Sequence, residues 1–228
     1  MISRWIAFIG LILTALILVP FVSVPPRDAL APLAEYYVEQ GPEELGAANL
    51  VTAVIVTYRG LDTLGEVAVL FIATAGVGIL LSRMGRREDS LRPSSEILSS
   101  GAALLYPLLL MFGAYIFIHG HLTPGGGFQG GVVIATGFLL LLLSGRAEKV
   151  NHLVLNLLES FSGAFYVAAG VLGLILAGGF LDNRFMALGE PGSLFSAGAI
   201  PVIYVLIGLK VGTELTGILE NMKGRTEA

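Results

Sequence analysis

Two pairs of charged residues occur at helical spacing inside otherwise apolar sequence. Asp62 and Glu66 lie in RGLDTLGE, and Lys210 and Glu214 lie in IGLKVGTELTG. Because the members of each pair are four residues apart, both side chains share one face of a helix. Ionisable groups inside an apolar helix are costly and usually face protein or water, so both pairs are candidates for binding Na⁺ or passing protons.

The acidic pair has a second interpretation. Asp62 could cap the start of a helix with Glu66 in its first turn, since the helix macrodipole favours negative charge there, and Arg59 could pair with them. Glu66 is the deeper of the two carboxylates. It is therefore the stronger candidate for handling an ion.

The second pair also has two interpretations. Lys210 and Glu214 could form an internal ion pair that packs the bundle, or a charge relay, because a buried lysine loses its proton readily. Gly208 and Gly212 form a GxxxG face that lets another helix approach closely. Glu159 lies at the cytoplasmic start of the fifth apolar stretch, and we expect it at the membrane interface rather than in a relay.

The segment 119–131 reads HGHLTPGGGFQGG, with five glycines between Pro124 and Gly131. It lacks the Gly-Lys-Ser/Thr ending of a phosphate loop, and we interpret it as a turn that packs its backbone against neighbouring helices. His119 and His121 have no third ligand nearby, so no metal site is expected. An imidazole titrates near neutrality, so either histidine could carry protons.

The composition points to lipid as the solvent of this chain. Of its 228 residues, 55% are hydrophobic and only 13% are charged. The net charge of −4 gives no reason to expect a nucleic acid as a partner. The absence of cysteine excludes disulfides, iron–sulfur ligation and thiol nucleophiles. No nucleophile–base set or cofactor motif is evident, so the sequence does not predict an enzyme or a bound cofactor.

Six apolar stretches predict an all-α, polytopic membrane protein with about six transmembrane helices. We expect the first to be a retained helix rather than a signal peptide, and the short fourth to be extended by its polar flank up to Lys149. The acidic outer connection 23–63 contains an apolar segment, 49–58, that is too short to span and predicts a re-entrant or interfacial helix. The six stretches are 5–22, 64–81, 98–118, 128–143, 160–180 and 194–219.

The basic residues predict that the N- and C-termini are both cytoplasmic, in a multi-pass protein of the cell membrane. The outer loops then contain Arg27 and Arg184, with Arg59 near the outer boundary. The cytoplasmic segments contain Arg4, Arg83, Arg86, Arg87, Arg92, Arg146, Lys149, Lys223 and Arg225.

Two segments resemble known families. HGHLTPGGGFQGGVV resembles the signature of the MnhB-type subunit of Mrp-type multisubunit Na⁺/H⁺ antiporters. AVIVTYRGLDTLGEVAVLFIATAGVGILL is similar to the C-terminal tail of the large antiporter chain, its A-type subunit, and this element is a separate small protein in membrane-bound hydrogenase-type complexes. The first apolar stretch predicts a transmembrane helix at 1–24, and the resemblance implies a segment like the A-type tail at 25–93 and an MnhB-like four-helix domain at 94–228.

The resemblance also implies roles for particular residues. In the family, the carboxylates of the D-T-L-G-E motif are implicated in ion transport, which carries over to Asp62 and Glu66. Thr57 and Tyr58 stand where an acidic-aromatic pair is common, so no extra carboxylate is expected there. The ending with Lys210 and Glu214 looks closer to the hydrogenase-type branch. The loop signature, carried over as structural, comprises Pro124, Gly125, Gly126, Gly127, Phe128, Gly130 and Gly131.

Together these features predict a non-catalytic membrane subunit of a cation (Na⁺)/proton antiporter module. Na⁺ and H⁺ would be the transported ions, and the partners would be other membrane subunits of an Mrp-type or hydrogenase-type complex. The alternative is an assembly subunit of a membrane-bound respiratory complex, of the hydrogenase or sulfane-sulfur reductase type, without direct ion handling.

Overall fold

The computed structural model describes residues 2–22, 30–83, 94–146 and 151–223, and these residues form helices and connections without a strand. The chain divides into two compact units, residues 1–36 and 37–228. The domain boundaries expected at 24/25 and 93/94 lie outside the described residues. The predicted orientation stays a prediction, and Arg27, Arg86, Arg87, Arg92, Lys149 and Arg225, on which it partly depends, also lie outside them.

The first unit contains α1, Ile2–Val22, which corresponds to the first predicted stretch. Three of its large side chains, Trp5, Leu11 and Leu16, are more than half exposed. Such exposure is expected of a helix whose apolar surface contacts lipid or another membrane protein. A second helix, α2 (Pro32–Leu45), begins in this unit. This helix lies within the acidic connection 23–63, and hydropathy did not indicate it.

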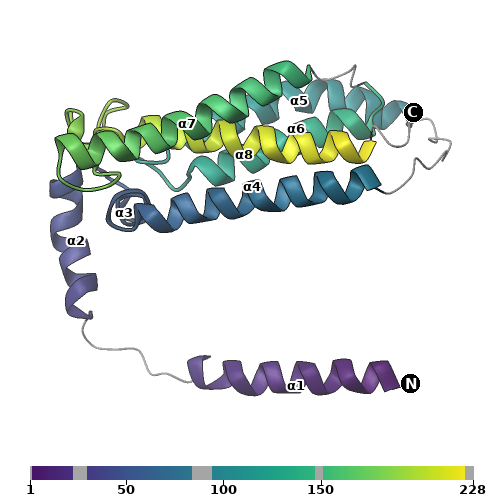
Figure 1. Ribbon diagram of the computed structural model, residues 1–228, viewed down its shortest axis with the longest axis horizontal. Helices are drawn as coiled ribbons and strands as arrows, with labels where there is room; N and C mark the ends of the chain where they lie inside the picture. The colour runs from purple at the N-terminus through teal and green to yellow at the C-terminus, as the bar shows by residue number, and fades with distance from the viewer. Residues whose placement is uncertain (1, 23–29, 84–93, 147–150, 224–228) are drawn as a thin grey trace. The chain divides into compact units, whose positions relative to one another are not determined.

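The second unit contains five long helices that correspond to the remaining predicted stretches (Figure 1). Four of these helices are long and apolar enough to cross a membrane, and α6 is shorter. The polytopic all-α prediction is therefore confirmed. The helices are α4 (Gly60–Arg83), α5 (Glu96–Ile118), α6 (Gly127–Leu143), α7 (His152–Leu176) and α8 (Ile200–Lys223).

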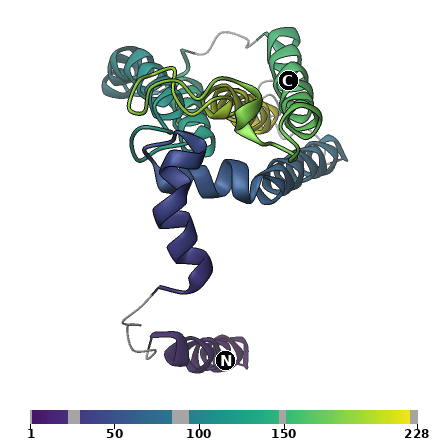
Figure 2. The same ribbon diagram turned by 90° about the vertical axis from the view of Figure 1, so that its left-hand side faces the viewer.

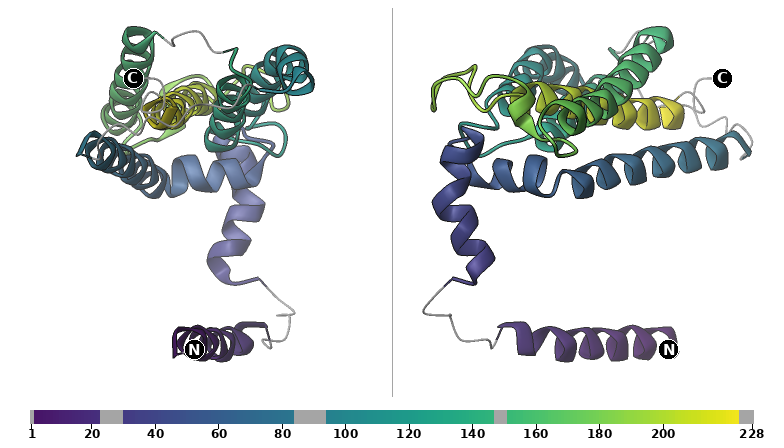
Figure 3. Two further views of the ribbon diagram at one scale, coloured as in Figure 1. Left: turned by 90° about the vertical axis from the view of Figure 1, so that its right-hand side faces the viewer. Right: turned by 60° about the vertical axis from the view of Figure 1, so that its left-hand side comes forward.

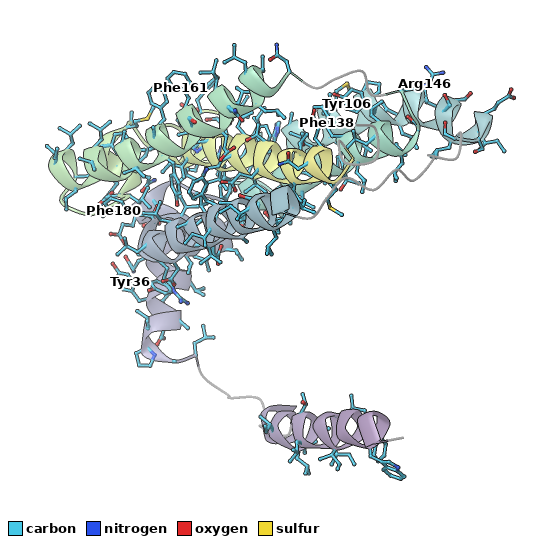
Figure 4. The ribbon with its side chains drawn as sticks, turned by 45° about the vertical axis from the view of Figure 1, so that its right-hand side comes forward. Tyr36, Tyr106, Phe138, Arg146, Phe161 and Phe180 are labelled. Carbon is cyan, nitrogen blue, oxygen red and sulfur yellow. The ribbon has the colours of Figure 1, made fainter. Side chains whose placement is uncertain are left out.

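Helix α8 is the centre of this unit, with α4, α5, α6 and α7 arranged around it (Figures 2 and 3). Small residues permit a close contact of α6 with α8, because a Cβ on Gly131 of α6 would lie 2.8 Å from the Gly208 carbonyl oxygen of α8. The close approach predicted for the face of Gly208 and Gly212 is thus confirmed. On the far side of α6, Phe138 meets Tyr106 of α5 edge to face, with ring centroids 5.5 Å apart (Figure 4).

Several helix ends differ from the predicted stretches. Helix α7 begins at residue 152 rather than 160, because Asn151 caps it by accepting hydrogen bonds from the Leu153 and Val154 amides. Helix α8 begins at 200 rather than 194, since positive φ angles at Ala197 and Gly198 interrupt the chain. Helix α6 ends at residue 143 and does not extend toward 149, because Gly145 adopts a positive φ.

The segment 49–58 is helical, as predicted, and contains α3 (Leu50–Ala53) followed by one π-helical turn, η1 (Val54–Tyr58). Side chains of this segment bind the glycine-rich turn. Asn49 Nδ2 donates to the Gly120 carbonyl at 2.9 Å, and Thr52 Oγ1 donates to the same oxygen at 2.7 Å. The short helix is therefore tied to the connection between α5 and α6.

Candidate functional site

A buried lysine lies between two carboxylates where α4, α7 and α8 meet. Lys210 Nζ is 2.6 Å from Glu214 Oε1, one turn along α8, and 3.8 Å from Glu159 Oε1 of α7. The exposed fractions of Lys210 and Glu214 are 9% and 3%. From α4, the Phe71 ring lies under the ammonium, with its centroid 5.0 Å from Nζ. Three helices thus supply one charged cluster, with a cation–π contact on one side.

The lysine pair confirms the predicted i, i+4 contact, whereas the contact of Glu159 with Lys210 was not predicted. We expected Glu159 at the membrane interface, apart from any relay. Because α7 begins at residue 152, Glu159 lies in the second turn of that helix and within ion-pair distance of Lys210. The signal that could have located it is the polar capping residue Asn151, which moves the start of the helix.

A glycine on α7 makes room for the lysine. A Cβ on Gly163, one turn after Glu159, would lie 3.3 Å from both Cδ and Cε of Lys210. The lysine stem therefore packs against the backbone of α7, and its ammonium reaches Glu159 on the same helix face. A larger residue at position 163 would compete with the lysine for this space.

A polar cavity of about 240 Å³ adjoins the cluster, lined by residues of α4, α7 and α8. A water molecule takes up roughly 30 Å³ in the liquid, so the space can hold several waters or a hydrated cation. In the described part of the chain, Glu214 Oε2 is buried and has no hydrogen-bond partner. The polar lining side chains are Thr74, Asn156, Glu159, Thr213, Glu214 and Asn221.

Asp62 and Glu66 share one face of α4, as their spacing predicts, and both line a second cavity of about 200 Å³. Asp62 is in the first turn of the helix rather than at its N-cap, and it pairs with Arg59 as the second interpretation predicted. Its Oδ2 accepts a hydrogen bond of 2.7 Å from Arg59 Nε, and both side chains are more than half exposed. Thr63 also lines the cavity and donates to the Ile55 carbonyl at 2.5 Å.

The two histidines lie apart from these carboxylates. Neither imidazole has a hydrogen bond or an ion pair with Asp62, Glu66, Lys210 or Glu214 among the described residues. His119 stacks on Tyr115 with ring centroids 4.3 Å apart. His121 is buried, and burial lowers its pKa below the usual value of 6.5 despite a 3.4 Å contact from Nε2 to the Ser193 carbonyl.

The glycine-rich turn is built for close backbone contact, as predicted. A Cβ on Gly127 would lie 2.6 Å from Ile207 Cβ of α8, and one on Gly120 would lie 2.5 Å from the Tyr204 ring. Within the described residues, no group of three or more His, Asp or Glu side chains could hold a metal ion. The turn therefore positions α6 against α8, and the ionisable cluster lies further along α8.

Residues 97–217 match the domain described as related to the MnhB subunit of Na⁺/H⁺ antiporter. The chain belongs to this MnhB-related family. Residues 7–97 match a second family, MbhE, which is described as one of the subunits of MBH. The MnhB-related chain thus combines two family matches that meet near the start of α5.

Relatives of this MnhB-related protein are components of multisubunit membrane complexes. A chain of the membrane-bound sulfane sulfur reductase, an archaeal respiratory membrane complex, is 45% identical with a TM-score of 0.82, covering 97% of this chain and 98% of that one. The A/B-type subunit of a probable K⁺/H⁺ antiporter of Rhizobium meliloti is 33% identical over 155 residues, which are 57% of this chain and 16% of that one. This chain therefore spans about a sixth of that relative.

The fold also occurs in a longer chain. The structure of the Mrp complex from Dietzia sp. DQ12-45-1b has a chain that is 21% identical with a TM-score of 0.80, covering 99% of this chain and 26% of that one. At this identity the likeness concerns the fold alone. The arrangement of helices described above is therefore shared by chains of very different length.

Proposed function

We propose that this chain is a membrane subunit of an ion-translocating module within a multisubunit complex of the cell membrane. The family match and the 45% identical chain of an archaeal respiratory complex support this assignment. The chain supplies no catalysis and no bound cofactor of its own, so redox chemistry belongs to partner subunits. The observation that carries an ion-handling role is the buried Lys210 between Glu214 and Glu159.

The proposed ions are Na⁺ and H⁺, and the cluster can couple them by competition. The Lys210 ammonium and a Na⁺ ion both require the negative charge of Glu159 and Glu214. A cation that enters the adjoining polar cavity lowers the attraction between these carboxylates and the ammonium. The lysine then releases its proton more readily. Binding of one ion therefore favours release of the other, as exchange requires.

Asp62 and Glu66 would receive the cation at the second cavity, which is formed by η1 and the start of α4. Their carboxylates line that cavity with Arg59, and Arg59 balances part of their charge. Glu66 has the larger role in this proposal because it lies one turn deeper in α4. His119 and His121 would act at most as separate proton carriers in the turn between α5 and α6.

An assembly role is the second candidate. Asp62 and Arg59 pair on a surface that is more than half exposed, and such a pair can also contact a partner protein. In that case, substitutions at Asp62 or Glu66 would lower recovery of the complex. Transport would fall only in proportion to recovery.

Lys210→Met and Glu66→Gln test the proposal in the assembled complex. Na⁺-driven proton movement in vesicles, divided by the amount of intact complex, should fall about tenfold or more for each variant. Glu190→Gln, an exposed change in the connection between α7 and α8, is the control and should leave exchange unchanged. Full exchange per complex in both test variants would leave the assembly role as the explanation.

A further inference from the structure

A buried tyrosine hydroxyl lies at the interface of α4, α7 and α8, and the proposed function does not use it. Tyr166 of α7 is 1% exposed, and its hydroxyl has no hydrogen-bond partner in the described part of the chain. Buried polar groups are nearly always hydrogen-bonded, to protein or to ordered water. An orphaned hydroxyl inside an apolar cluster therefore requires an explanation.

The level of Tyr166 along the bundle follows from the residues that meet Lys210. Both Phe71 of α4 and Gly163 of α7 lie against the lysine, so these three residues share one level. The rise of an α-helix is about 1.5 Å per residue. Tyr166 is three residues beyond Gly163, and Glu66 is five residues before Phe71, so they lie about 4.5 Å and about 7.5 Å from that level.

Both displacements point in the same direction, because α4 and α7 run antiparallel. The cavity beside the lysine cluster shows this, since it is lined by Thr74 and Gly78 from the later part of α4 and by Asn156 from the early part of α7. Moving away from that cavity means moving toward lower numbers on α4 and higher numbers on α7. Tyr166 therefore lies between the level of Lys210 and the level of Glu66.

The surroundings of Tyr166 are apolar, so a proton needs a carrier there. Val67 of α4 and Ile203 and Ile207 of α8 belong to the same buried cluster as the tyrosine and exclude bulk water. Glu66, the exposed residue that precedes Val67 on α4, is near enough for its charge to act on the Tyr166 hydroxyl, although no hydrogen bond joins them. One unpaired hydroxyl thus lies inside an apolar cluster, between the levels of Lys210 and Glu66.

We propose that the Tyr166 hydroxyl passes protons between Lys210 and Glu66 across the interface of α4, α7 and α8. The oxygen accepts a proton that an intervening water relays from the Lys210 ammonium, and a second water passes the hydroxyl proton to the Glu66 carboxylate. Lys210 becomes neutral, Glu66 becomes a carboxylic acid and the tyrosine is unchanged. No electrons are transferred. This inference rests on the proposed ion-handling role of the two charged residues.

Tyr166→Phe removes one oxygen and keeps the ring, so it is the direct test in the assembled complex. Na⁺-driven proton exchange per intact complex should fall about tenfold or more, and Tyr166→His should restore part of it because imidazole also carries protons. Tyr106→Phe, the same change in α5 beside Phe138, is the matched control and should leave exchange unchanged. Thermal stability of the Tyr166→Phe complex should equal or exceed that of the native complex, since an unpaired hydroxyl is removed.

The outcomes separate this inference from the proposed function. If Lys210→Met and Glu66→Gln abolish exchange and Tyr166→Phe does not, the tyrosine is outside the path while the ion-handling role stands. If none of the three affects exchange, both fail. If Tyr166→Phe lowers stability and exchange together, and Tyr166→His restores neither, the hydroxyl is structural and the inference is overturned.

Discussion

Lys210 and Glu214 form an ion pair with 2.6 Å between Nζ and Oε1, and the Glu214 side chain is wholly shielded from solvent. Burial of such a pair is costly, and removal of one partner leaves an uncompensated charge. Glu159 does not compensate fully, because its carboxylate is 3.8 Å from the ammonium and partly exposed. Variants of this pair can therefore separate its contribution to protein stability from its contribution to transport.

The first prediction concerns this pair. Glu214→Leu should destabilise the protein by about 3–5 kcal/mol, since it strands the buried ammonium. The double variant Lys210→Met/Glu214→Leu should recover most of that stability while transport stays lost. Thermal unfolding of the purified complex and exchange in vesicles are the two measurements. A double variant as unstable as Glu214→Leu would contradict the assignment of the loss to an unpaired charge.

Much of the helical framework could be predicted from the sequence. Long apolar stretches have few alternatives to a helix in lipid, so the five long helices of the second unit match the predicted stretches. The i, i+4 spacing likewise predicted the contact of Lys210 with Glu214. Both the helices and this contact depend on residues close together in the chain, so the sequence alone is enough to predict them.

The rest of the site depends on tertiary contacts. Glu159 joins Lys210 only because α7 packs on α8, and its polar neighbourhood obscured the true start of α7. Tyr166 is one aromatic residue among many in apolar helices, so neither its spacing nor its type indicated an unpaired hydroxyl. Helix α2 was missed because its acidic residues suppress the hydropathy on which the prediction relied.

The second prediction concerns pH. Burial lowers the pKa of His121 below 6.5, so the unfolded chain binds a proton at a pH where the folded chain does not. The stabilising contribution of the neutral imidazole is present above about pH 6.5 and is lost as the pH falls below that value. The melting temperature should therefore drop on acidification from pH 7 toward pH 5, and His121→Gln should flatten this dependence.

The matched control for that experiment is His119→Gln in the same turn. His119 is half-buried and stacks on Tyr115, so His119→Gln makes the same substitution in the same turn and controls for the loss of an imidazole ring as such. An unchanged slope in His121→Gln would assign the pH dependence to other groups. A melting temperature of the native complex that stays constant from pH 7 to pH 5 would contradict the prediction that acidification destabilises the protein.

The third prediction concerns Asn183 in the connection between α7 and α8. This buried side chain donates two hydrogen bonds of 2.9 Å, to the Leu45 carbonyl and to the Ala197 carbonyl. Asn183→Ala leaves buried carbonyl oxygens without these donors, so the protein should lose about 1–3 kcal/mol of stability. Glu190→Gln, an exposed change in the same connection, should be neutral by the same thermal measurement. Equal stability of the two variants would show that water replaces the asparagine.

The fourth prediction concerns the contact between α6 and α8. A Cβ on Gly131 would meet two backbone atoms of α8, the Gly208 oxygen at 2.8 Å and the Gly212 nitrogen at 3.0 Å, and backbone cannot move aside as a flexible side chain can. Gly131→Ala should therefore separate the helices and cost about 1–3 kcal/mol.

Gly76→Ala in α4 is the matched control, because a Cβ there has open space within 4 Å. It adds the same methyl group to a helix interior and should be neutral or slightly stabilising. Recovery of intact complex and its melting temperature distinguish the two variants. Because Lys210 lies between Gly208 and Gly212 in sequence, a shift of α8 at Gly131→Ala should also reduce exchange per complex, whereas Gly76→Ala should not. Native stability in Gly131→Ala would mean that the two helices are not in the close contact described here.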